Sequence, residues 1–108
     1  MKKLLSIIIS SMAFTSMVYG DGHISTVFGI GTTSCGKYIS EVSADGNAKS
    51  AYGWWVSGFV SGTNMVKGRI VSTDSAAHEA WLKNYCEQYP LDSFVAAASR
   101  LNKELDNK

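Results

Sequence analysis

Apolar residues between positions 35 and 105 recur at the spacing of helices. The stretch 48–65 places its large apolar side chains on one face, at Tyr52, Trp55, Val56, Phe59 and Val60. A second set occupies positions Ala77, Trp81, Leu82, Tyr85, Cys86 and Tyr89. A third set follows steps of three and four, at Leu91, Phe94, Ala98, Leu101 and Leu105. With a short helix over residues 35–42, the pattern predicts an all-α domain of four helices spanning residues 33–105.

Turn-forming residues and caps separate these predicted helices. Residues 43–47, with the sequence SADGN, predict a turn after the first helix. The segment 67–69 interrupts the chain after the second helix, and Thr73 or Asp74 is a candidate N-cap of the third. Pro90 separates the third helix from the fourth.

The first twenty residues have the pattern of a secretory signal peptide. Lys2 and Lys3 precede a mostly apolar stretch from residue 4 to residue 18, which is shorter than the roughly 20 residues of a membrane span. Residues 18–20 fit a cleavage site, so we expect the mature chain to begin at Asp21 in a bacterial periplasm, without stable membrane insertion. Residues 21–32 are rich in glycine and lack a helical period, which predicts an extended arm.

Two cysteines, Cys35 and Cys86, remain after the predicted cleavage. The periplasm is oxidising, and a small exported domain often needs a covalent crosslink. We therefore expect an intramolecular disulfide between the first and third helices, with a stabilising effect on the order of 4 kcal/mol for a loop of about fifty residues. The alternative is an intermolecular bond in a homodimer.

The charge balance argues against nucleic-acid binding. Without Lys2 and Lys3, the ten basic residues of the chain become eight, against nine acidic residues, which gives a net charge of −1. A nucleic-acid-binding domain of this size usually has a clustered basic face.

The sequence GTTSCGKY at residues 31–38 has the G-x-x-x-x-G-K spacing of a phosphate-binding loop. Such a loop needs Ser or Thr after the lysine to hold Mg²⁺, and here Tyr38 stands there. A short exported chain also lacks the doubly wound sheet and the nucleotide supply. We expect instead that Thr33 or Ser34 caps a helix whose first turn carries Cys35.

Catalytic and metal-binding patterns are incomplete. His78 and Glu79 begin the zinc-protease pattern H-E-x-x-H, but Leu82 replaces its second histidine. Cys35 and His78 could form a thiol and base pair only if Cys35 were free of a disulfide. We therefore expect no enzyme activity, no cofactor and no metal site.

The second predicted helix contains glycines and two adjacent tryptophans. Gly58 and Gly62 lie one turn apart, a spacing that lets another helix approach closely, and we expect them to pack inside the domain; the alternative is a ligand groove. Trp54 and Trp55 point about 100° apart, so both cannot face the core. One of them is a candidate partner-binding residue, and the alternative is a partly covered position at the edge of the helix.

Three segments carry a resemblance to known families: SCGKYISE from residue 34, YGWWVSGFVSGTN from residue 52 and AWLKNYCEQYPLDSFVAAASRL from residue 80. They resemble small exported bacterial proteins, and are similar in plan to the HdeA/HdeB acid-stress chaperones and to the Tai-like amidase-immunity proteins of type VI secretion. The resemblance covers roughly residues 33–105. It implies a small helical periplasmic domain in which Cys35 and Cys86 form the disulfide.

Three roles follow from this combination of features. An acid-stress chaperone would hold client proteins after low pH loosens its fold. An immunity or inhibitor protein would stay folded and bind one toxin. A structural accessory protein of the periplasm would need neither property. The sequence therefore predicts a non-enzymatic protein-binding protein whose partner is another protein.

Overall fold

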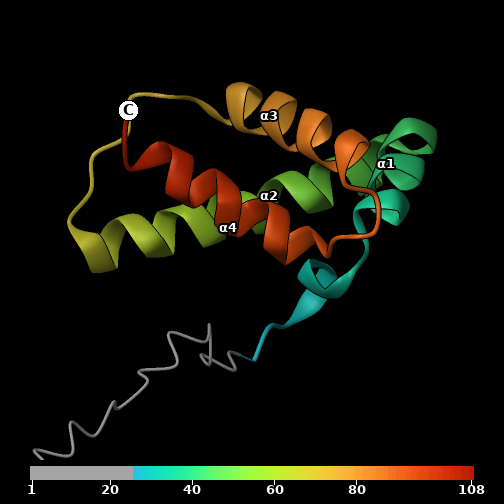
Figure 1. Ribbon diagram of the computed structural model, residues 1–108, viewed down its shortest axis with the longest axis horizontal. Coiled ribbons are helices and arrows are strands. Elements are labelled where there is room, and N and C mark those ends of the chain that lie inside the picture. Colours follow the sequence, from blue (N-terminus) through green and yellow to red (C-terminus); the bar gives the residue numbers. More distant parts are fainter. Residues whose placement is uncertain (1–25) are drawn as a thin grey trace, which may run out of the picture.

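The computed structural model describes residues 26–108, and the predicted signal peptide and residues 21–25 lie outside this part of the chain. A short 3-10 helix, η1 (Gly29–Thr32), precedes four α-helices: α1 (Cys35–Ala44), α2 (Gly46–Lys67), α3 (Ser75–Gln88) and α4 (Phe94–Leu105). Figure 1 shows α2, α3 and α4 running alongside one another, with α1 at one end. The described residues form no β-strand, so the all-α prediction is confirmed for them.

Each α-helix begins at a polar residue whose side chain accepts a hydrogen bond from a backbone N–H of the first turn. These caps are Ser34, Asp45, Asp74 and Ser93. They satisfy N–H groups that have no partner within the helix. Ser34 and Asp74 confirm one choice from each of the two predicted capping pairs.

The turn predicted at residues 43–47 is wrong in extent. Helix α1 continues to Ala44 and α2 already begins at Gly46, so only Asp45 lies between them. Its extended backbone and capping carboxylate allow the chain to change direction within one residue. The predicted interruption at residues 67–69 is confirmed, because Gly68 ends α2 in the left-handed conformation with φ of 61°.

An aromatic cluster forms the centre of the core. The rings of Tyr38, Tyr52 and Phe94 contact one another with centroid separations of 4.6 to 4.9 Å. Phe94 is fully buried, and aliphatic side chains surround the cluster, including Val56 and Leu82. Helices α1, α2 and α4 thereby share one core.

The predicted disulfide is confirmed. Cys35 at the start of α1 and Cys86 near the end of α3 are bonded, and both are completely buried. The bond joins residues 51 positions apart in the sequence.

Backbone hydrogen bonds join the chain before α1 to the chain before α4. The N–H of Cys35 donates to the carbonyl of Asp92 at 2.7 Å, and that of Gly36 donates to the carbonyl of Pro90 at 2.9 Å. In the other direction, the N–H of Phe94 donates to the carbonyl of Thr33 at 2.6 Å. The starts of the two helices are therefore fixed side by side.

Arg69, in the linker after α2, connects that linker to the end of α4. Its guanidinium donates to Asn64 Oδ1 and to both the carbonyl and the side-chain oxygen of Asn102, each at 2.7 Å. It also pairs with Asp106 at 2.9 Å, and Lys67 pairs with the same carboxylate at 3.0 Å. These contacts hold the linker against the C-terminal helix.

Three details of the predicted pattern are wrong. Residues 29–32 are not extended, because side-chain and backbone hydrogen bonds close them into η1. Leu91 is 97% exposed and precedes α4, which begins only after the turn at Pro90. On α3, His78 is buried and Ala77 is exposed, so the buried face is rotated by one residue there.

Candidate functional site

The two tryptophans of α2 have different environments. Trp55 Nε1 donates to the carbonyl of Phe28 at 3.0 Å, and its ring stacks on Phe59 with centroids 5.3 Å apart. Its ring also covers Gly31, where an added Cβ would lie 2.2 Å from the indole. Trp54 is 78% exposed. Trp55 therefore holds the N-terminal segment on α2, and Trp54 is the exposed member of the pair.

The outer face of α2 is uncharged. Helix α2 has no charged residue between Lys49 and Lys67. Trp54, Gly58, Gly62 and Met65 are three or four residues apart and therefore follow one side of the helix. All four are exposed. We call these four residues the α2 outer face.

The prediction that Gly58 and Gly62 pack inside the domain is wrong. A Cβ added at either glycine would meet no atom within 4 Å among the described residues. Beyond Met65, the apolar surface continues through Val66 and Ile70, which are 89% and 93% exposed. The glycines thus leave a smooth, accessible strip between an exposed tryptophan and an exposed apolar end.

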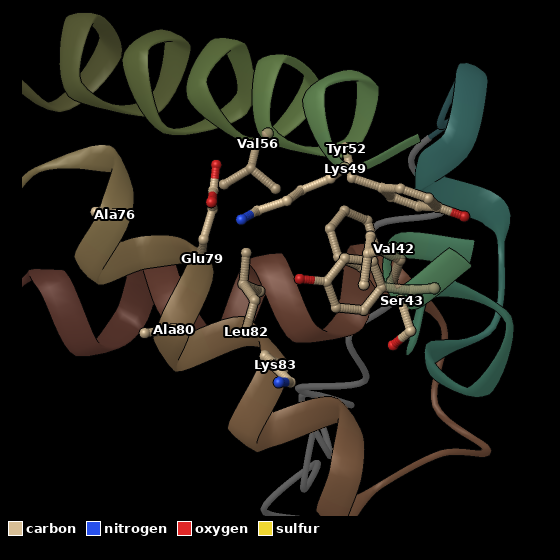
Figure 2. Close-up of a pocket in the computed structure, with 13 residues that line it drawn as sticks. Val42, Ser43, Lys49, Tyr52, Val56, Ala76, Glu79, Ala80, Leu82 and Lys83 are labelled. Carbon is tan, nitrogen blue, oxygen red and sulfur yellow. The ribbon is translucent and has the colours of Figure 1, made fainter. Parts of the chain in front are cut away.

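A pocket of 380 Å³ lies between α1, α2 and α3. The buried apolar core forms its floor, through Tyr52, Val56, Leu82 and Phe94. Figure 2 shows the side chain of Lys49 reaching from α2 toward Glu79 of α3 across this pocket, while the hydroxyl of Tyr52 points away from it. That hydroxyl donates to Glu41 Oε2 at 2.5 Å.

Tyr38 contributes a polar group to the pocket lining. Its side chain is 5% exposed, and its hydroxyl makes no hydrogen bond to the described residues. Burial, followed by the charge of Glu79 and the neighbouring Tyr52, raises the pKa of Tyr38 to about 12. The phenol is therefore neutral at physiological pH and available as a hydrogen-bond donor.

A second, shallower hollow of 670 Å³ lies between α3 and α4. Along its α3 side, Trp81 stacks on Tyr85 and Tyr85 contacts Tyr89, with centroids 5.4 Å and 4.8 Å apart. The hydroxyl of Tyr85 donates to Asp92 at 2.5 Å, and this hydrogen bond is the main reason why the pKa of Tyr85 is raised. The aromatic row therefore fastens α3 to the loop before α4.

The segment that matches a phosphate-binding loop uses its backbone N–H groups within the domain. Those of Cys35 and Gly36 donate to carbonyls of the loop before α4, and that of Lys37 donates to Ser34 Oγ at 3.1 Å. A phosphate-binding loop requires such N–H groups to point at the ligand. These three are already occupied.

The residues considered for catalysis are engaged in other contacts. Cys35 is in the disulfide, which removes its thiol. His78 Nε2 lies 2.8 Å from Thr73 Oγ1, and burial is the main cause that lowers the pKa of His78. Within residues 26–108, no group of three or more His, Cys, Asp or Glu side chains could hold a metal ion, and no helix is long and apolar enough to cross a membrane.

No family model, curated protein or solved structure matches this chain. The resemblance to the HdeA/HdeB and Tai-like families therefore stays a prediction. Sequence reasoning identified Trp54 as one of two candidates, but it missed the pocket between α1, α2 and α3. Lys49 and Glu79 are 30 positions apart, and nothing in their local sequence indicates that they face the same cavity.

Proposed function

We propose that this protein is an exported, non-enzymatic protein-binding protein that uses the α2 outer face to bind an uncharged, apolar helix of another protein. One observation carries the proposal: α2 exposes Trp54 beside two glycines for which the isolated domain has no packing use.

The glycines are unfavourable for the isolated domain. Each glycine inside an exposed helix costs up to about 1 kcal/mol relative to alanine. Space is open above both Gly58 and Gly62, so no neighbour in the domain compensates for that cost. Close approach of a second helix would compensate for it, because a strip without side chains allows two backbones to pack at short distance.

The absence of charge on the α2 outer face defines the chemistry of the partner. An exposed surface without charge offers no ion pair to a charged partner, and burying a partner's charge against it would be costly. An apolar helix gains free energy instead, since it covers Trp54, Met65 and Val66, which are otherwise in contact with water. The partner segment is therefore expected to be helical, apolar and uncharged where it crosses Gly58 and Gly62.

The same exposure favours binding in the folded state. An acid-activated chaperone needs its client-binding surface covered at neutral pH, whereas Trp54 and Met65 are 78% and 84% exposed in the folded domain. This supports an immunity, inhibitor or accessory role over an acid-stress chaperone role. Clefts and catalytic groups are not needed for such a role.

Two variants test the α2 outer face without disturbing the core. Trp54→Ala removes the exposed ring, and Gly62→Leu fills the smooth strip where space is open. Leu91→Ala is the control, because Leu91 is also a large apolar residue and is 97% exposed, but it lies outside α2. We expect the melting temperature of Gly62→Leu to be at least that of wild type, because leucine has the higher helix propensity.

The tagged proteins are used to capture partners from periplasm at pH 7, and sedimentation measures self-association of each variant. The proposal predicts a captured protein whose purified complex weakens about 30-fold or more in Trp54→Ala and in Gly62→Leu, as for a binding hot spot, but not in Leu91→Ala. Equal binding by all three variants would contradict the use of this face. If the wild-type protein self-associates and only the two α2 variants abolish this, the helix bound by the α2 outer face belongs to a second copy of this chain. That result would contradict binding to a different protein.

A further inference from the structure

We propose that the pocket between α1, α2 and α3 binds a small zwitterion with an apolar body, of the class of α-amino acids with large apolar side chains. This site is separate from the α2 outer face and does not depend on the function proposed for that face.

The size and floor of the pocket suit such a molecule. Its volume of 380 Å³ falls within the range of about 300 to 1,000 Å³ that is typical of small-molecule sites. The floor is formed by apolar and aromatic side chains, among them Val56, Leu82 and Phe94. An aromatic or branched aliphatic side chain would cover this floor and release water from it.

The hydroxyl of Tyr38 in the pocket lining makes no hydrogen bond to the described residues, so it can donate to a polar ligand. Tyr38 is 5% exposed and lines the pocket, and no described residue accepts from or donates to its hydroxyl. Among the described residues no fully buried side-chain oxygen or nitrogen lacks a partner, so this hydroxyl is accessible from the pocket, where a ligand would replace solvent as its acceptor. By contrast, the hydroxyl of Tyr52 is already bound to Glu41 and adds nothing to the pocket.

Glu79 supplies the negative charge on the α3 side. Its Oε1 atom lies so close to Gly53 on α2 that a Cβ there would be 2.8 Å away. The absence of a side chain at Gly53 therefore makes room for this carboxylate against α2. Glu79 forms no ion pair with any described residue, which leaves it available to an ammonium group.

Lys49 supplies the positive charge on the α2 side. Its side chain extends over the pocket toward Glu79, yet the two form no ion pair (Figure 2). The other cation on the rim, Lys83, is paired with Glu87 at 4.0 Å along α3. One unpaired anion and one unpaired cation thus face one apolar cavity from two helices.

A zwitterion satisfies all of these groups together. Its ammonium contacts Glu79, its carboxylate contacts Lys49 and accepts from the Tyr38 hydroxyl, and its apolar side chain covers the floor. A simple amine would leave Lys49 and Tyr38 without partners, and a simple carboxylic acid would leave Glu79 without one.

Three probes with the same ring separate these alternatives: phenylalanine, 2-phenylethylamine and 3-phenylpropionate. Binding is measured by NMR chemical-shift titration of the full domain. We expect a dissociation constant for phenylalanine of about a millimolar or tighter, given its twelve non-hydrogen atoms. The amine and the acid should each bind at least about 5-fold more weakly. Equal affinity of all three probes, or no saturable shift with phenylalanine, would overturn the proposal.

Variants locate the site. Glu79→Gln removes the charge and should weaken phenylalanine binding about 10-fold. Gly53→Ala improves helix propensity but displaces the Glu79 carboxylate, so it should also weaken binding while the domain stays folded. Glu104→Gln, which removes a carboxylate from α4, is the control. Binding that Glu104→Gln weakens as much as Glu79→Gln, or that neither Glu79→Gln nor Gly53→Ala weakens, would refute the assignment.

Discussion

Replacing both Cys35 and Cys86 by alanine should remove much of the stability of the domain. Both side chains are 0% exposed, so alanine avoids the buried and unpaired hydroxyl that serine would introduce. The crosslink closes a loop across 51 residues, from the start of α1 to the end of α3. Without it, the unfolded chain regains the conformations that the closed loop excludes.

The magnitude follows from the length of the loop. The chain-entropy relation gives about 4 kcal/mol at 25 °C for a loop of this length. A domain of about 80 residues has a total unfolding free energy of roughly 4 to 12 kcal/mol. At a urea dependence of about 1 kcal/mol per molar, the midpoint should fall by about 4 M, or the variant should be unfolded without urea.

Urea unfolding followed by circular dichroism tests this value. Wild type is measured oxidised and with excess reducing agent, and the double alanine variant is measured alongside. The two forms without a disulfide should agree within about 1 kcal/mol, since they lack the same constraint. A double variant within about 1 kcal/mol of oxidised wild type would refute the entropic argument. If the double alanine variant is much less stable than reduced wild type, the lost packing of the two side chains contributes more to the change in unfolding free energy than the lost crosslink does.

Three further predictions concern other parts of the domain. Burial lowers the pKa of His78 below its usual 6.5, so the unfolded chain takes up this proton first and the unfolding free energy should fall as pH drops below about 6.5. In urea titrations between pH 7 and 5, the unfolding free energy of His78→Gln should fall less with pH than that of wild type. An equal fall in the two proteins would contradict the role of His78. Arg69→Leu should lower the unfolding free energy by about 2 to 3 kcal/mol, because it leaves buried oxygens of α4 without a donor. The exposed Lys67→Ala should cost less than about 1 kcal/mol, and equal losses would be evidence against the Arg69 network. Gly31→Ala would place a Cβ 2.2 Å from the ring of Trp55, so it should red-shift the tryptophan fluorescence, and an unchanged spectrum would count against this contact.

Local patterns predicted the helices well. Helical spacing, polar caps and a glycine after α2 are properties of neighbouring residues, and each is visible in the sequence. The disulfide was also predictable, because the chain has only two cysteines and one intramolecular pairing is therefore open to them. The boundaries were less predictable, since one capping residue, Asp45, was enough to separate α1 from α2.

The environment of each helix face was harder to predict. The spacing of Gly58 and Gly62 indicates a helix contact, but it does not tell whether the second helix belongs to the same chain. Trp54 and Trp55 differ because residues 28–31 cover only Trp55. The pocket depends on α1, α2 and α3 meeting in space, which no local pattern encodes.

The position of Phe94 sets the order in which this fold becomes complete. This ring is fully buried against Tyr38 and Tyr52, yet it lies on α4, which follows the other three described α-helices in the sequence. Synthesis proceeds from the N-terminus, so the residues of α1 to α3 are synthesised before Phe94, the residue at the centre of their core. A nascent chain that ends before residue 94 therefore has an open aromatic cluster. We expect such a chain to be cut readily by proteases, and to become resistant once α4 has been added.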